Sequence, residues 1–425
     1  MQHLGNLWPV IAEPKIAASQ LGSDLSLDMA IVGGGFTGCS AALEGARRGA
    51  SVGLFEAETF GHGGSGRNVG LVNAGLWLPP QTILDTMGEA PGRKLMDALA
   101  VAPALVWSLI EREAIDCEAT PNGTLHLAHS PAGLRNLNER YGQARSLNWP
   151  VSLLDADETA RRTGSNSFHG ALFDPRAGTI NPLAYARGLA RAAAKAGARI
   201  YERSRTTTIS REGDLWTLTV NGYTVRAKSL LLATNAYFSG IQMSFRPQIV
   251  AMSYFQLATV PMPKKLRDVI LPGGEGCWDT GLIMSSFRLD RAGRMIVGGI
   301  GDLEGKAQPI HAAWARRKLR RTFPELGDLP FEHAWSGRIA MTHDHIPKIV
   351  RFGPDAYACF GYSGRGIGPA TAFGMQSAIA LLEENEDALP VAAVNDHQEV
   401  FVSAKEAFFA TGSALSHAVN PLPFR

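Results

Sequence analysis

One short segment near the start of the chain limits its possible folds more than any other. The sequence Gly33-Gly-Gly-Phe-Thr-Gly38 follows an apolar run at residues 28–32 and precedes residues 36–48, whose apolar side chains recur every three to four positions. This order predicts a buried strand, a tight turn and a helix with one apolar face that ends at Gly49. Residues 50–55 indicate a second strand, so the segment as a whole predicts a βαβ unit.

The spacing Gly33-x-Gly35-x-x-Gly38 between a strand and a helix is typical of a dinucleotide-binding turn. The first glycine permits the turn, the second admits a pyrophosphate against the backbone, and the third lets helix and strand pack closely. The phosphates then lie at the positive end of the helix dipole. Glu56, 18 residues after Gly38, would accept hydrogen bonds from the ribose hydroxyls and repel a 2′-phosphate. We therefore expect a dinucleotide other than NADP.

A second glycine-rich segment, residues 61–70, begins within ten residues of Glu56. It favours a cofactor longer than NAD, because an NAD enzyme of this length usually continues with further βαβ units. An NAD-dependent dehydrogenase stays open as an alternative. Serine hydrolase chemistry is excluded, because Gly63-Gly-Ser-Gly-Arg67 and Gly361-Tyr-Ser-Gly-Arg365 both lack the last glycine of Gly-x-Ser-x-Gly.

Composition excludes other classes of protein. The 41 basic and 39 acidic residues leave a net charge of +2, so a strongly basic nucleic-acid binder is not expected. No apolar run approaches the roughly 18 residues of a membrane span, and the N-terminus lacks a signal-peptide pattern. The four cysteines are far apart, which favours a reducing, cytoplasmic location and no metal site. His343-x-His345 is an alternative metal pair that lacks a nearby third ligand.

The rest of the chain alternates between two kinds of pattern. Helices are expected at residues 93–114, 133–147, 181–197, 312–322 and from about 368 to 382. Strands are expected at residues 124–128, 200–209, 216–220, 223–227, 230–233, 250–259, 282–289, 294–298 and 357–360. Asn221-Gly222 predicts a tight hairpin between two of these strands. The βαβ signals fall at the start, middle and end of the chain, with two insertions of different character between them.

This ordered set of motifs resembles the FAD-dependent amine oxidase family, which includes glycine oxidase, D-amino-acid oxidase, sarcosine oxidase and a γ-glutamylputrescine oxidase-like branch. Ser65-Gly-Arg-Asn68 is most similar to that last branch, and the resemblance covers about residues 28–385. It implies an α/β fold (α+β overall), in which a Rossmann-type FAD-binding domain from split segments carries an inserted antiparallel-sheet substrate domain with helices. The FAD-binding segments would be residues 1–80, 161–238 and 331–425, and the substrate segments 81–160 and 239–330.

The resemblance also implies a set of FAD-binding residues. The ADP half would contact Gly33, Gly35, Phe36, Gly38, Glu56 and Ala57, with Thr206 near the adenine. The pyrophosphate, ribityl chain and flavin would contact Gly64, Ser65, Gly66, Arg67, Asn68, Ala233, Thr234, Gly337, Gly364, Gly366 and Ile367. Gly337 occupies the register of the cysteine that bonds the flavin in sarcosine oxidases, and His62 is off the family's histidine-linkage position. Non-covalent FAD is therefore expected.

The implied activity is oxidation of a C–N bond in a small amino or imino acid, such as glycine, sarcosine, iminodiacetate or a D-amino acid. A hydride would pass to flavin N5, and O₂ would reoxidise the flavin. A substrate carboxylate favours an arginine partner, for which Arg288, Arg338 and Arg365 are candidates, and Tyr254 is a candidate cavity wall. No catalytic base and no oligomeric state is indicated. A γ-glutamylputrescine-type oxidase, a dehydrogenase with another acceptor and a non-catalytic flavin-binding subunit stay open.

Overall fold

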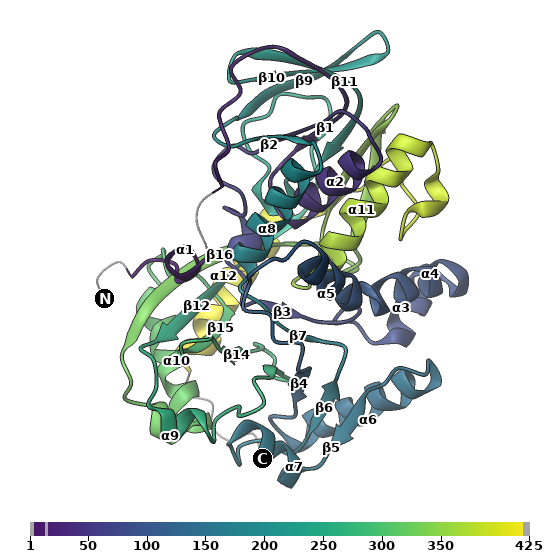
Figure 1. The fold of residues 1–425 in the computed structure, drawn as a ribbon. Coiled ribbons are helices and arrows are strands. Elements are labelled where there is room, and N and C mark those ends of the chain that lie inside the picture. The colour runs from purple at the N-terminus through teal and green to yellow at the C-terminus, as the bar shows by residue number, and fades with distance from the viewer. Residues whose placement is uncertain (1–3, 13–15, 420–425) are drawn as a thin grey trace.

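Two sheets, each built from strands that are distant in sequence, organise the molecule (Figure 1). The computed structural model describes residues 4–12 and 16–419. The first sheet has the order β17-β18-β11-β1-β2-β8, and β10 and β9 extend it beside β11. Its strands are β1 Leu25–Val32, β2 Val52–Phe55, β8 Arg199–Tyr201, β9 Thr206–Glu212, β10 Leu215–Val220, β11 Tyr223–Leu232, β17 Lys348–Gly353 and β18 Ala356–Phe360.

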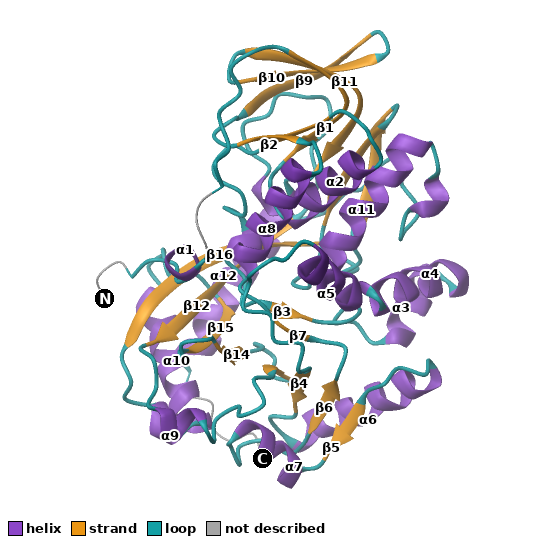
Figure 2. Cartoon of the chain, viewed as in Figure 1, coloured by secondary structure: helices purple, strands orange, loops and turns teal. Residues whose placement is uncertain are grey.

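Strand β1 is buried on both faces at the centre of this sheet. It pairs in parallel with β2 and β11. Met29 and Ile31 pack toward three helices, whereas Ala30 and Val32 pack toward the layer of β9 and β10. Burial on both faces explains why the strand is a continuous apolar run. Figure 2 shows the three helices together along the sheet: α2 Phe36–Arg47, α8 Pro182–Lys195 and α11 Ile367–Glu383.

The second sheet has the order β16-β12-β15-β14-β13-β4-β6-β5 and is antiparallel except for the β4–β13 pair. Its strands are β4 Thr124–Leu127, β5 Ser152–Leu154, β6 Ala171–Asp174, β12 Val250–Thr259, β13 Gly276–Asp279, β14 Ser286–Leu289, β15 Met295–Ile300 and β16 Phe331–Met341. Helices α10 Gln308–Thr322 and α12 Val402–Ala418 pack together on it. The α/β fold with an antiparallel second sheet is confirmed.

Shorter elements join the two sheets. The two-stranded ladder of β3 Leu71–Val72 and β7 Gly178–Thr179 lies between them (Figure 1). The remaining helices are α1 Trp8–Ile11, α3 Pro80–Met87, α4 Glu89–Ala100, α5 Ala102–Arg112, α6 Pro131–Ser146, α7 Ala156–Thr163 and α9 Lys264–Arg267. The second sheet also takes β6 from residues 161–238 and β16 from residues 331–425, so its strands come from more segments than residues 81–160 and 239–330.

Five expected elements have different limits in the structure. The single helix expected at residues 93–114 is two helices, α4 and α5, because Pro103 belongs to the first turn of a new helix. The strand expected at 200–209 divides into β8 and β9 around Arg203, which has φ +48°. The strands expected at 223–227 and 230–233 are one strand, β11. Of residues 282–289 only β14 is a strand, and Leu282 is 98% exposed.

A buried arginine connects the second sheet to the β3–β7 ladder. Arg288 on β14 is 1% exposed, and its guanidinium donates to the carbonyl oxygen of Ile180, with Gly70 O at 3.5 Å. Its Nε donates to Leu289 O at 3.1 Å, and the guanidinium lies 5.7 Å from the ring centroid of Trp8. Arg288 therefore holds the β3–β7 junction against the second sheet through carbonyl groups.

We expect Arg288→Met to lower the free energy of unfolding by about 2–3 kcal/mol, because buried carbonyl groups lose a charged donor. Urea unfolding followed by circular dichroism measures the change. Arg291→Met is the matched control: this neighbouring arginine pairs with Asp116 at the surface, and its loss should change stability by less than about 1 kcal/mol. Wild-type stability in Arg288→Met would contradict the structural role.

Candidate functional site

The first glycine turn brings three segments of backbone into contact. Gly33 has φ +108°, and a Cβ there would lie 2.8 Å from the carbonyl oxygen of Ala233, just after β11. A Cβ at Gly38 would lie 1.9 Å from Gly33 O, because α2 crosses β1 at this point. Gly35 is the N-cap residue of α2 and provides no side-chain cap. The turn therefore leaves backbone N–H groups at the positive end of α2 for an anionic ligand.

Glu56 follows β2 and its carboxylate faces this turn. Its Oε2 accepts a hydrogen bond from Gly34 N–H at 2.7 Å, and its Oε1 accepts one from Glu58 N–H at 2.9 Å. Burial raises the pKa of Glu56, and the two N–H donors oppose that rise. Ala57 continues the chain from this strand end. A carboxylate beside the N-terminus of α2 is the arrangement that a ribose and its pyrophosphate require.

The second glycine loop packs directly on the first. Ser65 Oγ accepts a hydrogen bond from Phe36 N–H at 3.0 Å, and a Cβ at Gly35 would lie 2.8 Å from the same oxygen. Asn68 Nδ2 donates to Gly64 O at 2.9 Å and so closes the loop on itself around the short 3₁₀ turn Gly64–Gly66. The predicted contact between the two glycine-rich segments is thus present.

Two indole groups and one arginine fix this second loop from the side of the second sheet. Trp8 Nε1 donates to Asn68 O at 2.9 Å, and Trp335 Nε1 donates to Arg67 O at 2.7 Å. Arg67 in turn donates to Ser336 O at 3.2 Å. The loop therefore lies between the N-terminus of α2 and strand β16.

The third glycine-rich segment reaches the same place from the C-terminal part of the chain. Tyr362 OH and Thr37 Oγ1 on α2 are 2.8 Å apart, and Asn235 Oδ1 accepts a hydrogen bond from Gly361 N–H at 3.0 Å. Gly364 has φ +92°, and no protein atom lies within 4 Å of a Cβ built at Gly366. The segment then enters α11 at its first residue, Ile367.

Several buried polar atoms of the predicted site residues lack a hydrogen-bond partner among the described residues. They include Thr206 Oγ1 on β9, Thr234 Oγ1 just after β11 and Tyr254 OH on β12. Buried polar groups are rarely left unpaired, so partners from a bound molecule are expected at these positions. The three glycine-rich segments, residues 33–38, 61–70 and 361–368, together form a glycine cradle. With this cradle and Glu56, the unpaired donors and acceptors fit an elongated dinucleotide such as FAD.

Gly337 on β16 lies opposite Tyr254 on β12. A Cβ at Gly337 would lie 2.5 Å from Tyr254 OH, so the tyrosine side chain crosses the position that a side chain at residue 337 would occupy. Burial raises the pKa of Tyr254, which keeps its hydroxyl protonated at neutral pH. Glycine at position 337 therefore leaves room for the Tyr254 side chain and provides no nucleophile for a covalent bond.

The three candidate arginines lie in different environments. Arg288 is committed to the carbonyl groups described above. Arg338 is exposed on β16, with its guanidinium 4.9 Å from the ring centroid of Tyr237. Arg365, in the segment before α11, donates to Ala74 O at 2.8 Å and lies 4.6 Å from the ring centroid of Trp278. Burial lowers the pKa of Arg365 to about 9, and no carboxylate pairs with it among the described residues.

The ring beneath Arg365 belongs to a pair that sequence reasoning missed. Trp278 on β13 stacks on His126 of β4, with ring centroids 3.4 Å apart. The two strands pair in parallel and align these residues, which are 152 positions apart in sequence. Neither residue belongs to a recognisable motif, so only the strand register could have shown that they meet.

The two histidines of the alternative metal pair have different neighbours: His343 groups with His397 and Glu399 and not with His345. His343 Nδ1 and His397 Nε2 each lie 3.2 Å from Glu399 Oε1, and Lys405 Nζ lies 3.2 Å from Glu399 Oε2. The ligand atoms of His343, His397 and Glu399 all lie within 4.8 Å of one another. His345 instead packs on a ring, with its centroid 4.8 Å from that of Trp77. The cluster is connected as an ion-pair network around the buried Glu399.

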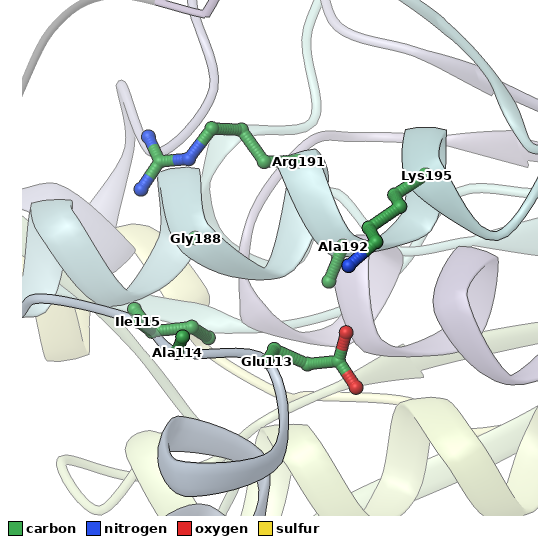
Figure 3. A pocket seen from close by; sticks show the side chains of 7 residues that line it. All are labelled: Glu113, Ala114, Ile115, Gly188, Arg191, Ala192 and Lys195. Atoms are coloured by element: carbon green, nitrogen blue, oxygen red, sulfur yellow. The ribbon is translucent and has the colours of Figure 1, made fainter.

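A pocket lies between α8 and the segment of residues 113–115 (Figure 3). It is lined by Glu113, Ala114, Ile115, Gly188, Arg191, Ala192 and Lys195, none of which belongs to the glycine cradle. Among the residues that the structure describes, no helix combines the length and the apolar character needed to cross a membrane.

A protein-family model and several named proteins match this chain in sequence. A family model described as FAD dependent oxidoreductase matches residues 28–378. The chain is 31% identical over 347 residues to the probable oxidoreductase OrdL of Rhizobium meliloti, covering 80% of this chain and 79% of that protein. It is 29% identical over 374 residues to the gamma-glutamylputrescine oxidoreductase of Escherichia coli, covering 86% of each.

The fold is similar to that of a solved glycine oxidase from Geobacillus kaustophilus. The TM-score is 0.72 at 21% sequence identity, covering 88% of this chain and 100% of that one. The family match spans most of the chain and both sheets, and the glycine cradle, Glu56 and the unpaired polar atoms fit the cofactor of that family. The chain therefore belongs to the DAO family of FAD-dependent oxidoreductases, and its cofactor is FAD.

Proposed function

We propose that the protein oxidises the C–N bond of a small amino or imino acid, such as glycine, sarcosine, iminodiacetate or a D-amino acid. The carbon beside the neutral amine loses a hydride, the nitrogen lone pair forms the C=N bond, and water hydrolyses the imine to an oxo acid and an amine or ammonia. Bound FAD supplies the hydride acceptor, N5. O₂ then takes the two electrons together with two protons and becomes H₂O₂.

The observation that carries this proposal is the environment of Arg365. It is a guanidinium without a carboxylate partner among the described residues, in the segment that meets the glycine cradle and precedes α11. A partly buried cation in this state is stabilised by an anionic ligand, and a substrate carboxylate provides one with matching geometry. Arg365 would thereby orient the substrate, with Tyr254 as part of the cavity wall. Arg288 and Arg338 are the weaker candidates, since one is committed to carbonyls and the other is exposed.

The same contacts support roles for the predicted FAD-binding residues. The ADP half would lie along Gly33, Gly35 and Gly38, with its ribose on Glu56 and its adenine near Thr206. The isoalloxazine would lie between the Gly64–Asn68 loop, Gly337 and the Gly364–Ile367 segment. The N-terminus of α11 has no side-chain cap, and its positive end would stabilise the negative charge of the reduced flavin. Non-covalent binding is favoured, because residue 337 is glycine.

The names of relatives support a substrate that carries both an amine and a carboxylate. One relative is named gamma-glutamylputrescine oxidoreductase, and a structurally similar protein is titled glycine oxidase. The four cysteines are free and buried, which supports work in the cytoplasm. A dehydrogenase that uses another acceptor and a γ-glutamylputrescine-type oxidase are the alternatives within the same chemistry.

A panel of amino acids, imino acids and simple polyamines tests this function. We expect carboxylated amines to bleach the flavin anaerobically and to release H₂O₂ in air. Arg365→Met should lower kcat/KM for these substrates by about 10- to 100-fold, since a charge-assisted contact is lost. Arg93→Met, which alters an exposed arginine on α4, should have no effect.

Three results would contradict parts of the proposal. Turnover of polyamines without any carboxylated amine would exclude the amino-acid class. Flavin bleaching without peroxide would indicate another acceptor. A flavin that no amine reduces would indicate a binding subunit without turnover.

Gly366→Ala tests the cofactor arrangement independently of turnover. The position has φ −111° and no protein atom within 4 Å of a new Cβ, so the variant should fold normally. If the isoalloxazine packs here, the added methyl group should weaken FAD binding about 10-fold or more, which equilibrium dialysis measures. Gly412→Ala on α12 also has free space and should keep wild-type affinity. Unchanged FAD affinity in Gly366→Ala would remove this segment from the cofactor site.

A further inference from the structure

A second arginine, Arg140, contacts the same short segment of backbone as Arg365, residues 74–77. Arg365 Nη1 donates to Ala74 O at 2.8 Å, and Arg140 Nη1 donates to Trp77 O at 2.8 Å. Arg140 comes from α6, in a part of the chain that is far from Arg365 in sequence. The two side chains therefore reach residues 74–77 from segments that are far apart in sequence, and the charge of Arg140 contributes to the lowered pKa of Arg365.

Charges around these two guanidiniums do not balance. Among the described residues, neither Arg140 nor Arg365 forms an ion pair. The nearby carboxylate, Asp174, is already bound by Arg176 through two contacts of 2.9 and 2.7 Å. Arg140 has one further polar contact, from Nε to Asn136 Oδ1 at 3.0 Å. The region thus holds two more positive charges than it neutralises.

The two aromatic residues beside Arg365 cannot supply the missing negative charge. Arg365 lies over Trp278, which stacks on His126, and burial together with the two arginines lowers the pKa of His126 well below its usual value. His126 is therefore neutral at physiological pH. Two partly buried cations, of which Arg365 lies over an aromatic ring, are costly to keep without an anion, and each guanidinium retains N–H groups for one.

We propose that Arg140 and Arg365 form a two-cation subsite, so that the preferred substrate carries two carboxylates: Arg365 binds the one nearer the reacting amine, and Arg140 binds the second. This inference rests on the proposed function, which requires one carboxylate on the substrate. It adds the specificity: amines with two acidic groups are preferred over amines of matched length with one.

Binding of unreactive acids tests the subsite without turnover. Malonate, succinate and glutarate are compared with acetate, butyrate and valerate by the change that each causes in the flavin spectrum of the holoenzyme. We expect at least one dicarboxylate to bind wild type about 10-fold or more tightly than any monocarboxylate. Arg140→Met should remove most of that preference and leave monocarboxylate binding nearly unchanged. Arg365→Met should weaken both kinds of acid.

Two further variants control for effects on folding. Arg135→Met changes an exposed arginine on the same helix, α6, and should keep the wild-type preference. Arg140→Lys keeps the charge without the planar fork and should retain part of the preference, which separates a lost contact from a disturbed helix.

Either of two outcomes overturns the subsite. One is wild-type protein that binds no dicarboxylate more tightly than monocarboxylates. The other is an Arg140→Met variant that keeps the preference or weakens both kinds of acid equally. Because the assay measures equilibrium binding, it gives an answer even if no amine reduces the flavin, and loss of the two-carboxylate preference leaves oxidation of monocarboxylated amines intact.

Discussion

The close crossing of α2 over β1 is the contact on which the rest of the site depends. Gly38 lies so near Gly33 O that no side chain fits between them, and a Cβ at Gly33 would lie 2.8 Å from Ala233 O, just after β11. Helix and sheet are thereby brought together at backbone distance, and the N-terminus of α2 faces the strand ends. Every other part of the cofactor cradle is positioned against this turn, through Ser65 on one side and Tyr362 on the other.

The interleaving of the two sheets follows from the same constraint. A cradle that closes around an elongated ligand needs loops from several strand ends, and here they come from residues near 33, 65, 234 and 364. The strands of the second sheet lie between those loops in the sequence. Arg288 holds the β3–β7 ladder against the second sheet. Its guanidinium donates only to carbonyl oxygens and packs near Trp8.

Features fixed by local backbone chemistry could be predicted from the sequence. The glycine turn, Glu56 and the Asn221-Gly222 hairpin each depend on a few adjacent residues, and the structure contains all three. The limits of α4 and α5 could not be read from periodicity, because both halves share one apolar pattern. Contacts between residues distant in sequence were also out of reach: strand register aligns His126 with Trp278, and Arg140 meets the segment of residues 74–77 that Arg365 also contacts. The substrate side of the site is therefore less visible in the sequence than the cofactor side.

The two indole hydrogen bonds to the second glycine loop have a consequence for how the chain reaches its native state. One indole comes from residue 8 and the other from residue 335, and both hold adjacent carbonyl groups at residues 67 and 68. During synthesis the loop therefore emerges long before its second support exists. Contacts over such separations slow folding, since the cost of closing a long loop comes before the contacts that reward it. A nascent chain that stops short of residue 335 would carry the complete nucleotide fingerprint and still lack the second indole that holds the Gly64–Asn68 loop.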